Sequence, residues 1–463
     1  MEFLALLTGA TVAIAILAIA VYRRCRDFGT LVGIAALYYW SLFGAWYIVI
    51  DKTGGFSGQN YHYLESKLFP IALDQNYMIA LALYAGFIIV VELTLLALAF
   101  PAESAQVPPI PLRHEPILLI GFLAGVASAL LMADKLGMAW TLNASAYVYT
   151  RSDTGTWFTL HQVLNRVAMI PPALGLAVLA AGRGSRALVS SGRGYALWGY
   201  LALLGFMGTF TFVLGNKNEV LTALLAGVLA YIGTARKPNW VGVGLVTVAG
   251  LWFLYAIDFF RGVPLAGLRQ AVMGQVEQAT GVARFLASSN EAYGAHFSMY
   301  GVLSAGVEPR LGYSLYSLAC SAVPRVLWPD RPPDIYNYYV DSVGAVQNQG
   351  YSLHHATGWY LNFGYPGVAA GAVVMGLVWA YCLNARRRAP SGNLFRLFAA
   401  TAPWLFSACL PPLIRAGPEG YKGFLIEGVL IPVAVLAVSC RPKKARMRLG
   451  WHPERGTVWG TAR

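Results

Sequence analysis

The chain has 463 residues, of which 57% are hydrophobic and 12% are charged, and its formal net charge is +13. A mean hydropathy of +0.54, with apolar runs near the roughly 20 residues needed to cross a bilayer, excludes a soluble globular domain and predicts a polytopic helical membrane protein. Basic residues beside apolar spans are explained by topology and anionic lipid, so we expect no nucleic-acid partner.

Eleven apolar stretches are expected to cross the membrane as helices. In chain order they lie near residues 3–22, 28–50, 75–100, 116–133, 167–182, 195–214, 219–235, 240–260, 359–383, 394–413 and 424–440. Positive charges follow the first stretch instead of preceding it, so we interpret it as a span entering from outside and not as a signal peptide. Eleven crossings then leave the C-terminus inside.

Five clusters of Lys and Arg between these stretches agree with that topology. They are Arg23/Arg24/Arg26, Arg183/Arg186/Arg193, Arg236/Lys237, Arg386/Arg387/Arg388 and the tail from Arg441 to Arg448. Loops rich in Lys and Arg stay in the cytoplasm, so the basic tail 441–463 is predicted to be cytoplasmic and the N-terminus to be outside. One missed span would invert every later loop.

The same topology gathers five segments on the outer side. They are residues 51–74, 134–166, 215–219, 261–358 and 415–422. The stretch 311–327 within the longest segment is largely apolar, and Tyr and Trp are frequent there. We therefore expect helices that lie in the membrane interface. The whole chain, 1–463, is interpreted as one membrane domain with an elaborated outer loop at 261–358.

Cations are expected to converge on this outer face. They are Arg261, Arg269, Arg284, Arg310, Arg325 and Arg331 of the long loop, with Lys217, Arg415 and Lys422. A guanidinium gives paired, charge-assisted hydrogen bonds to phosphate oxygens, so such a surface suits a lipid-linked diphosphate that arrives sideways from the bilayer. The alternative is that these cations pair with acidic loop residues or bind ordinary phospholipid.

The sequence gives no sign of nucleotide, zinc or flavin chemistry. It contains neither a Walker loop nor a His-Glu-x-x-His motif, and no Gly-x-Gly-x-x-Gly turn leads from a strand. Five cysteines are scattered singly, without a Cys-x-x-Cys pair. They are expected to be small residues of the core and not a metal site or a disulfide framework.

Two segments at the end of the long loop resemble a known family. They are residues 323–332, VPRVLWPDRP, and residues 358–367, GWYLNFGYPG. These segments look like the late outer loop and following helix of the O-antigen and exopolysaccharide repeat-unit polymerases, the Wzy family, and the resemblance covers mainly residues 210–435. The chain departs from many relatives by having Thr357-Gly358 in place of an acidic residue and Lys217 in place of an arginine.

The resemblance implies an all-α, GT-C-like enzyme of the bacterial inner membrane, with loop 261–358 in the periplasm. Family members join a glycan carried on undecaprenyl diphosphate to a hydroxyl of another lipid-linked repeat, without a nucleotide sugar or metal. The partners implied are undecaprenyl-diphosphate-linked oligosaccharide, membrane lipids and a chain-length regulator protein. No cofactor is expected.

This chemistry suggests a role for each outer-face candidate. Positive charges would stabilise the departing diphosphate, and a histidine would accept the proton of the attacking hydroxyl. The catalytic candidates are His354, His355, Arg325 and Arg331; the diphosphate-binding candidates are Arg261, Arg269, Arg415 and Lys217; the sugar-binding candidates are Tyr336, Tyr339 and Trp359. Further candidate bases are His296, Glu291 and Glu419. The simpler alternatives are a helix cap for the histidines and an interfacial belt for the aromatic residues.

Alternative functions remain open beside the polymerase. An O-antigen ligase, which passes a finished glycan to lipid A core, would use similar arginines and a histidine. A transporter or flippase of the same lipid would carry ionisable residues inside its spans, lining an aqueous route. The expected spans contain few such residues, chiefly Glu92, Asp258 and Glu427. A purely structural membrane protein is the remaining alternative.

Overall fold

The computed structural model describes residues 1–54, 61–101, 112–136, 156–182, 194–260, 290–345 except 322, 324–326 and 329, 352–385 and 393–440. In these ranges the fold is all-helical, and the only extended pairing is a single bridge between Leu112 and Cys440. Ten helices are long and apolar enough to cross a membrane. The predicted all-α, multi-pass membrane class is therefore confirmed.

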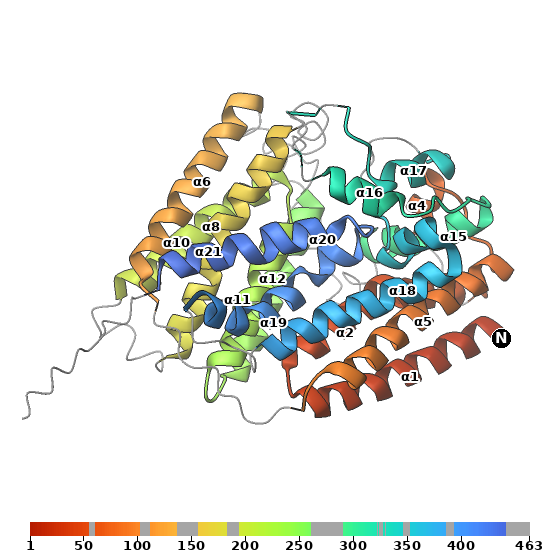
Figure 1. The fold of residues 1–463 in the computed structure, drawn as a ribbon, viewed down its shortest axis with the longest axis horizontal. Coiled ribbons are helices and arrows are strands. Elements are labelled where there is room, and N and C mark those ends of the chain that lie inside the picture. The colour runs from red at the N-terminus through yellow and green to blue at the C-terminus, as the bar shows by residue number, and fades with distance from the viewer. Residues whose placement is uncertain are drawn as a thin grey trace, which may run out of the picture.

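The membrane-length helices follow the predicted order (Figure 1). They are α1 (Glu2–Cys25), the continuous run α2 (Phe28–Tyr38), η1 (Tyr39–Phe43) and α3 (Gly44–Lys52), then α5 (Gln75–Leu98), α6 (His114–Leu136), α8 (Thr156–Ala181), α10 (Gly194–Leu214), α12 (Trp240–Phe260), α18 (His355–Ala385), α19 (Asn393–Ile414) and the run α20 (Gly420–Lys422), η4 (Gly423–Leu430) and α21 (Ile431–Val438). The expected span at 219–235 corresponds to a shorter apolar helix of 17 residues, α11 (Asn218–Thr234). The remaining helices are α4 (Tyr61–Lys67), α15 (Asn290–Ser304), α16 (Tyr313–Cys320) and α17 (Ile335–Ser342).

The span expected near 167–182 begins earlier than predicted, which corrects the outer segment 134–166. His161 and Arg166, both expected in that segment, lie within α8. His161 is fully buried, and its Nδ1 is 2.7 Å from the hydroxyl oxygen of Ser128 on α6. Polar side chains that find partners inside a helix bundle need not end a span, so hydropathy alone placed this boundary too late.

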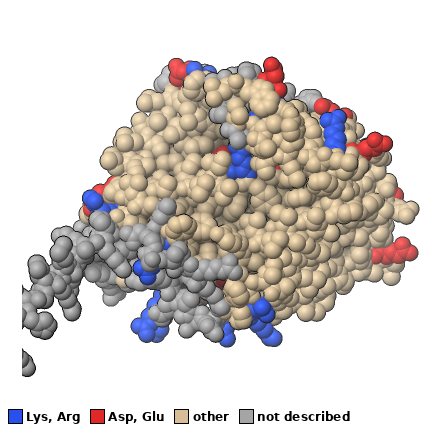
Figure 2. All heavy atoms as spheres, viewed as in Figure 1, with Lys and Arg blue, Asp and Glu red and all other residues tan. Residues whose placement is uncertain are grey.

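Three helices end side by side, as the predicted topology requires. Arg24 at the end of α1 donates from Nε to the carbonyl of Ala99, which follows α5, at 2.6 Å. Asn384 at the end of α18 accepts a hydrogen bond from the backbone N–H of Phe100 at 3.0 Å. Figure 2 shows a broad, mostly uncharged surface with one basic patch in its upper middle, mainly basic residues along its lower edge and both signs of charge along its upper edge.

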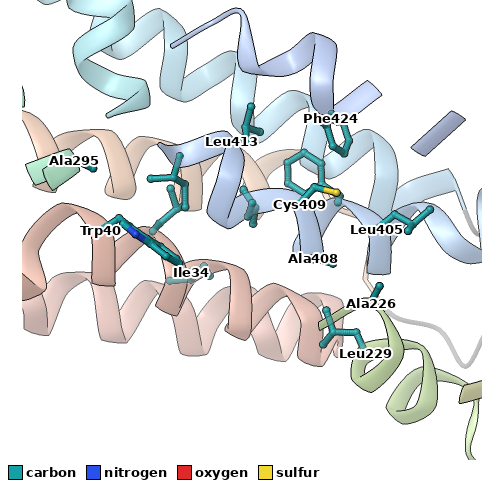
Figure 3. Packing of buried hydrophobic residues seen from close by; sticks show 14 of the residues in the cluster. Ile34, Trp40, Ala226, Leu229, Ala295, Leu405, Ala408, Cys409, Leu413 and Phe424 are labelled. Atoms are coloured by element: carbon teal, nitrogen blue, oxygen red, sulfur yellow. The ribbon is translucent and has the colours of Figure 1, made fainter. Parts of the chain in front are cut away.

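Helix α19 is the centre of the bundle. In it, 89% of the membrane-length window is buried, the largest share of any span. Its side chains Leu405, Cys409 and Leu413 pack between Ile34 of α2 on one side and Leu229 of α11 on another (Figure 3). Cys320, Cys382 and Cys409 are buried and unpaired, as expected for small core residues.

Helix α18 changes direction near its start, which positions the residues before the kink. Gly364 has φ 64° and ψ −148°, a conformation that glycine adopts without a side-chain clash, and Pro366 follows it. Trp359 packs against the glycine-lined face beyond the kink, since a Cβ at Gly371 would lie 2.3 Å from the Trp359 ring. The first turn of α18 is thereby fixed against the rest of the helix.

The short helices of the long loop differ in their burial. Helix α15 is inside the molecule, with Tyr293, Phe297 and Met299 fully buried. Helix α16 and the residue before its cap expose large apolar side chains, since Leu311 is 85% and Tyr316 is 56% exposed. Helix α17 belongs to a small separate core with Val302, Leu353 and Leu361.

Candidate functional site

The candidate site is at the end of the bundle where α15, α16 and α17 gather (Figure 1). Hydrogen bonds join five segments there that are far apart in the sequence. They are the start of α11, the end of α16, residues 330–335, residues 352–355 and the turn 415–422 between α19 and η4. Parts of three of the five segments that the sequence places on the outer side, 215–219, 261–358 and 415–422, therefore meet.

Arg331 and Lys422 contact the same carbonyl oxygen, that of Ser321 after α16. Lys422 Nζ donates to it at 2.7 Å, and Arg331 Nη1 donates to it at 3.3 Å. Arg331 Nη1 also donates to the carbonyl of Val323 at 3.1 Å, while its Nε is buried and has no partner among the described residues. Two positive charges thus lie side by side on one carbonyl oxygen.

Arg415 lies at the start of the turn 415–422, seven positions before Lys422. Its Nε donates to the hydroxyl of Ser352 at 3.0 Å, and its Nη1 is 3.4 Å from the side-chain oxygen of Asn218. Asn218 is the first residue of α11, and Lys217 caps that helix. These contacts bring a second pair of basic residues to the turn.

Glu419 stands in the same turn and is an acidic group with a shifted titration. Its Oε1 accepts a hydrogen bond from the backbone N–H of Ile335, the first residue of α17, at 3.1 Å. Burial raises the pKa of Glu419 to about 7, although the hydrogen bonds it accepts act in the opposite direction. A carboxyl whose pKa is raised toward neutrality can both accept and release a proton near pH 7.

His354 is fully buried just before α18. Its Nδ1 accepts a hydrogen bond from the backbone N–H of Ala356 at 3.1 Å, and its Nε2 is 2.9 Å from the hydroxyl oxygen of Ser41. Burial lowers the pKa of His354 well below its usual range. The ring is therefore neutral with its proton on Nε2, and both nitrogens are hydrogen-bonded.

His355 holds the first turn of α18 against the turn 415–422. Its Nδ1 donates to the carbonyl of Ala416 at 3.0 Å, and its Nε2 accepts a hydrogen bond from the indole N–H of Trp359 at 3.0 Å. The ring of Tyr421 lies edge-on, with centroids 5.1 Å apart. A base needs an available lone pair, so either histidine must first break a hydrogen bond before it can take the predicted role.

The three aromatic residues predicted to bind sugar differ in exposure. Tyr339 and Trp359 are buried, and Tyr336 is half-buried with its ring centroid 6.5 Å from that of Tyr339. Beside them, the guanidinium of Arg310 lies 3.8 Å above the ring of Tyr338, a cation–π contact. Tyr336 therefore has the most accessible ring of the three.

The other predicted residues fall into two groups. Arg261, Arg269 and Arg325 lie outside the described residues, as does the side chain of Glu291. His296 is buried in α15, with its Nε2 2.9 Å from the Tyr77 hydroxyl and its Nδ1 donating to a carbonyl. Lys217, Arg331, Arg415 and the two histidines are brought to one end of the bundle, with Lys422 and Glu419 among them.

A second charged group, not anticipated as a unit, lies between the helices. Arg166 of α8 is hydrogen-bonded to Glu427 of η4, and its Nε is 3.9 Å from Glu219 of α11. The sequence marks each residue only as a charge in or beside an apolar stretch. Their meeting depends on how α8, α11 and η4 pack, which local patterns do not encode.

Among the residues that the structure describes, no group of three His, Cys, Asp or Glu side chains is arranged to hold a metal ion. Comparison with protein-family models, with curated proteins and with solved structures finds no match to this chain.

Proposed function

We propose that this chain is a glycosyltransferase of the bacterial inner membrane that polymerises lipid-linked oligosaccharide repeat units on the periplasmic side. In this reaction the glycan moves from undecaprenyl diphosphate to a hydroxyl of an acceptor sugar. One observation carries the proposal: Arg331, Lys422 and Arg415 meet Glu419 at one end of an otherwise apolar bundle. Cations for a diphosphate and a proton acceptor for a hydroxyl are the two elements that the reaction needs.

The cations would bind the diphosphate and stabilise it as it departs. Negative charge grows on the diphosphate while the bond between the anomeric carbon and the phosphate oxygen breaks, and fixed positive groups lower that barrier. Arg331 and Lys422, which share the Ser321 carbonyl, would each give charge-assisted hydrogen bonds to phosphate oxygens. Arg415 and Lys217 would contact the second phosphate, and Arg261, Arg269 and Arg325 remain predicted partners.

The proton acceptor in this proposal is Glu419, ahead of His354 and His355. A carboxylate with a pKa of about 7 is suited to general base catalysis near neutral pH. It would take the proton from the acceptor hydroxyl as the new glycosidic bond forms, and the diphosphate would leave with the bonding electrons. The histidines would then position the site, since their nitrogens already bind Ser41, Ala356, Ala416 and Trp359.

Exposed apolar side chains beside the cations fit a lipid-linked substrate. Leu311, Leu315, Tyr316 and Leu327 flank the segment that holds Ser321, and each is between 45% and 85% exposed. We assign α16 to the membrane interface, where a polyprenyl chain could lie along these side chains while its diphosphate reaches Arg331. This arrangement gives the substrate lateral access from the bilayer.

A transporter of the same lipid is the second candidate, because Arg166, Glu219 and Glu427 form a buried charged group among the apolar helices. Ionisable residues inside spans are typical of ion-coupled carriers. The two candidates share a substrate and differ in whether a covalent bond forms.

The test is to incubate the purified protein in detergent with synthetic undecaprenyl-diphosphate repeat units and to separate the products by size. A ladder of lengthened glycans supports the polymerase. One transfer to added lipid A core without a ladder supports the ligase, and no transfer, with lipid movement in proteoliposomes, supports the transporter. Arg236→Ala is the matched control for each arginine variant at the candidate site. Arg236 follows the far end of α11, the helix whose first residue, Asn218, lies at that site.

A further inference from the structure

The three charged residues Arg166, Glu219 and Glu427 form a cluster, here called the Arg166 cluster, in which Glu219 is fully buried and the other two side chains are mostly buried. Arg166 lies nine residues into its span and Glu427 seven residues into its span, or about 14 and about 10 Å along the helix axes. Glu219 is in the first turn of α11 and is fully buried. Arg166 and Glu427 therefore lie away from the ends of their spans, and Glu219 is shielded from solvent.

The cluster carries one cation and two carboxylates. Glu427 is hydrogen-bonded to Arg166, but both carboxylate oxygens of Glu219 lack a hydrogen-bond partner among the described residues. Glu219 meets the guanidinium only at 3.9 Å, and no other Lys, Arg or His in the described part of the chain is within ion-pair distance of either glutamate. If both glutamates are ionised, one negative charge remains uncompensated.

The groups on the surrounding helices do not supply the missing charge. Cys409 of α19 faces the cluster as a thiol, and the Thr222 hydroxyl of α11 donates to the carbonyl of Asn218 at 2.9 Å. An uncompensated carboxylate is strongly disfavoured in an apolar interior. The described residues therefore leave the cluster one positive charge short when both glutamates are ionised.

A cavity of about 150 Å³ adjoins the cluster. Arg166, Thr222, Cys409 and Phe424 are among the residues that line it, and Figure 3 shows Cys409, Leu413 and Phe424 at the junction of α19 and η4. At roughly 30 Å³ per molecule it has room for about five waters. The π-helical turns of η4 place Phe424 and Gly428 in the wall of this cavity, beside Arg166, and such irregular turns occur frequently at functional sites.

We infer that the Arg166 cluster binds one monovalent cation, with the carboxylate of Glu219 as its main ligand. A proton on Glu219 and a hydrated Na⁺ held by Glu219 and Glu427 share this chemistry, and both restore neutrality. Loss of the cation changes the charge next to Asn218, whose side chain contacts Arg415 in the turn 415–422. The inference does not depend on the proposed function.

The test uses the full-length protein in detergent, with its thermal unfolding midpoint measured from pH 5 to 9 in NaCl or choline chloride at equal ionic strength. Bound Na⁺ predicts a midpoint about 3 °C higher in NaCl at high pH. A proton predicts no salt difference, but a midpoint that falls as pH rises. In Glu219→Gln the Na⁺ dependence should disappear, or the fall with pH should become shallower and keep only the part that Glu419 contributes. The exposed control Glu308→Gln should behave as the wild type.

A second variant keeps the inference testable if Glu219→Gln fails to accumulate. Glu427→Gln leaves Arg166 and Glu219 as a neutral pair, so it too should lose the Na⁺ dependence or show the shallower fall with pH. A wild-type midpoint insensitive to both, or an unchanged dependence in either glutamine variant, would overturn the inference.

Discussion

The two charged regions of this molecule hold their arginines differently. Arg331 donates to backbone carbonyls at the end of the bundle, whereas Arg166 is buried against carboxylates between helices. A carbonyl oxygen accepts a hydrogen bond without neutralising a full charge, so Arg331 keeps its attraction for an anion. The charge of Arg166 is already neutralised by its ion pair with Glu427. The comparison suggests that the first region binds a substrate and the second sets the electrostatics of the interior.

The largest expected effect is at Glu419, the proton acceptor that we propose for the first region. Glu419→Gln keeps the shape of the turn 415–422 but removes the basic oxygen, so polymerisation should fall by about a hundredfold to ten-thousandfold. Product ladders from purified protein measure this loss, with Glu308→Gln as the control. Near-normal ladders from Glu419→Gln would return the role of base to His354 or His355.

A substitution in the second region, the Arg166 cluster, should lower the free energy of unfolding. Arg166→Ala leaves Glu219 and Glu427 buried without their cation, so unfolding should become easier by about 3–5 kcal/mol. Thermal unfolding in detergent measures this, and Arg331→Ala, which loses only hydrogen bonds to backbone carbonyls, should cost about 1 kcal/mol. Equal destabilisation by the two variants would contradict the claim that Arg166 stabilises the fold much more than Arg331 does.

Substitution of Arg331 should mainly lower the polymerisation rate, not the stability. Arg331→Ala removes a donor to the departing diphosphate, and a loss of about a hundredfold to a thousandfold in polymerisation is expected at unchanged protein level. Arg331→Lys should restore little, because an ammonium cannot reproduce the guanidinium fork. Arg236→Ala serves as the control, and long chains made by Arg331→Ala would remove this residue from the mechanism.

The smallest effect is a pH dependence with opposite signs for rate and stability. Burial raises the pKa of Glu419 to about 7, so the initial rate should rise about tenfold per pH unit below 7 and level off above it. The contribution of Glu419 to stability is present below its ordinary value of 4.5 and is lost as pH rises through about 7. A rate that is flat between pH 5 and 7 would contradict Glu419 as the base.

The sequence predicted the helices well because each span carries its own signal in hydropathy. It predicted that Arg331, Arg415 and Lys422 would converge, because topology alone places their segments at one end. It could not predict the ranking of Glu419 over the histidines, since the hydrogen bonds of His355 to Ala416 and Trp359 come from tertiary packing.

The Arg166 cluster could not be predicted from the sequence. Arg166 was expected in the outer segment 134–166, because a hydropathy boundary cannot register that α8 continues with its polar side chains turned inward. Glu219 and Glu427 belong to α11 and η4, which are distant from α8 in the sequence and contact it only in the folded protein. Charges within helices become informative once their packing is known.

The most direct measurement of the central claim is the affinity of the purified protein for a short-chain polyprenyl diphosphate. Charge-assisted hydrogen bonds from Arg331 and Lys422 predict that Arg331→Ala and Lys422→Ala each weaken binding by about 10- to 100-fold, while Arg236→Ala has no effect. Equal affinity of all four proteins would contradict the assignment of this end of the bundle to a lipid-linked diphosphate.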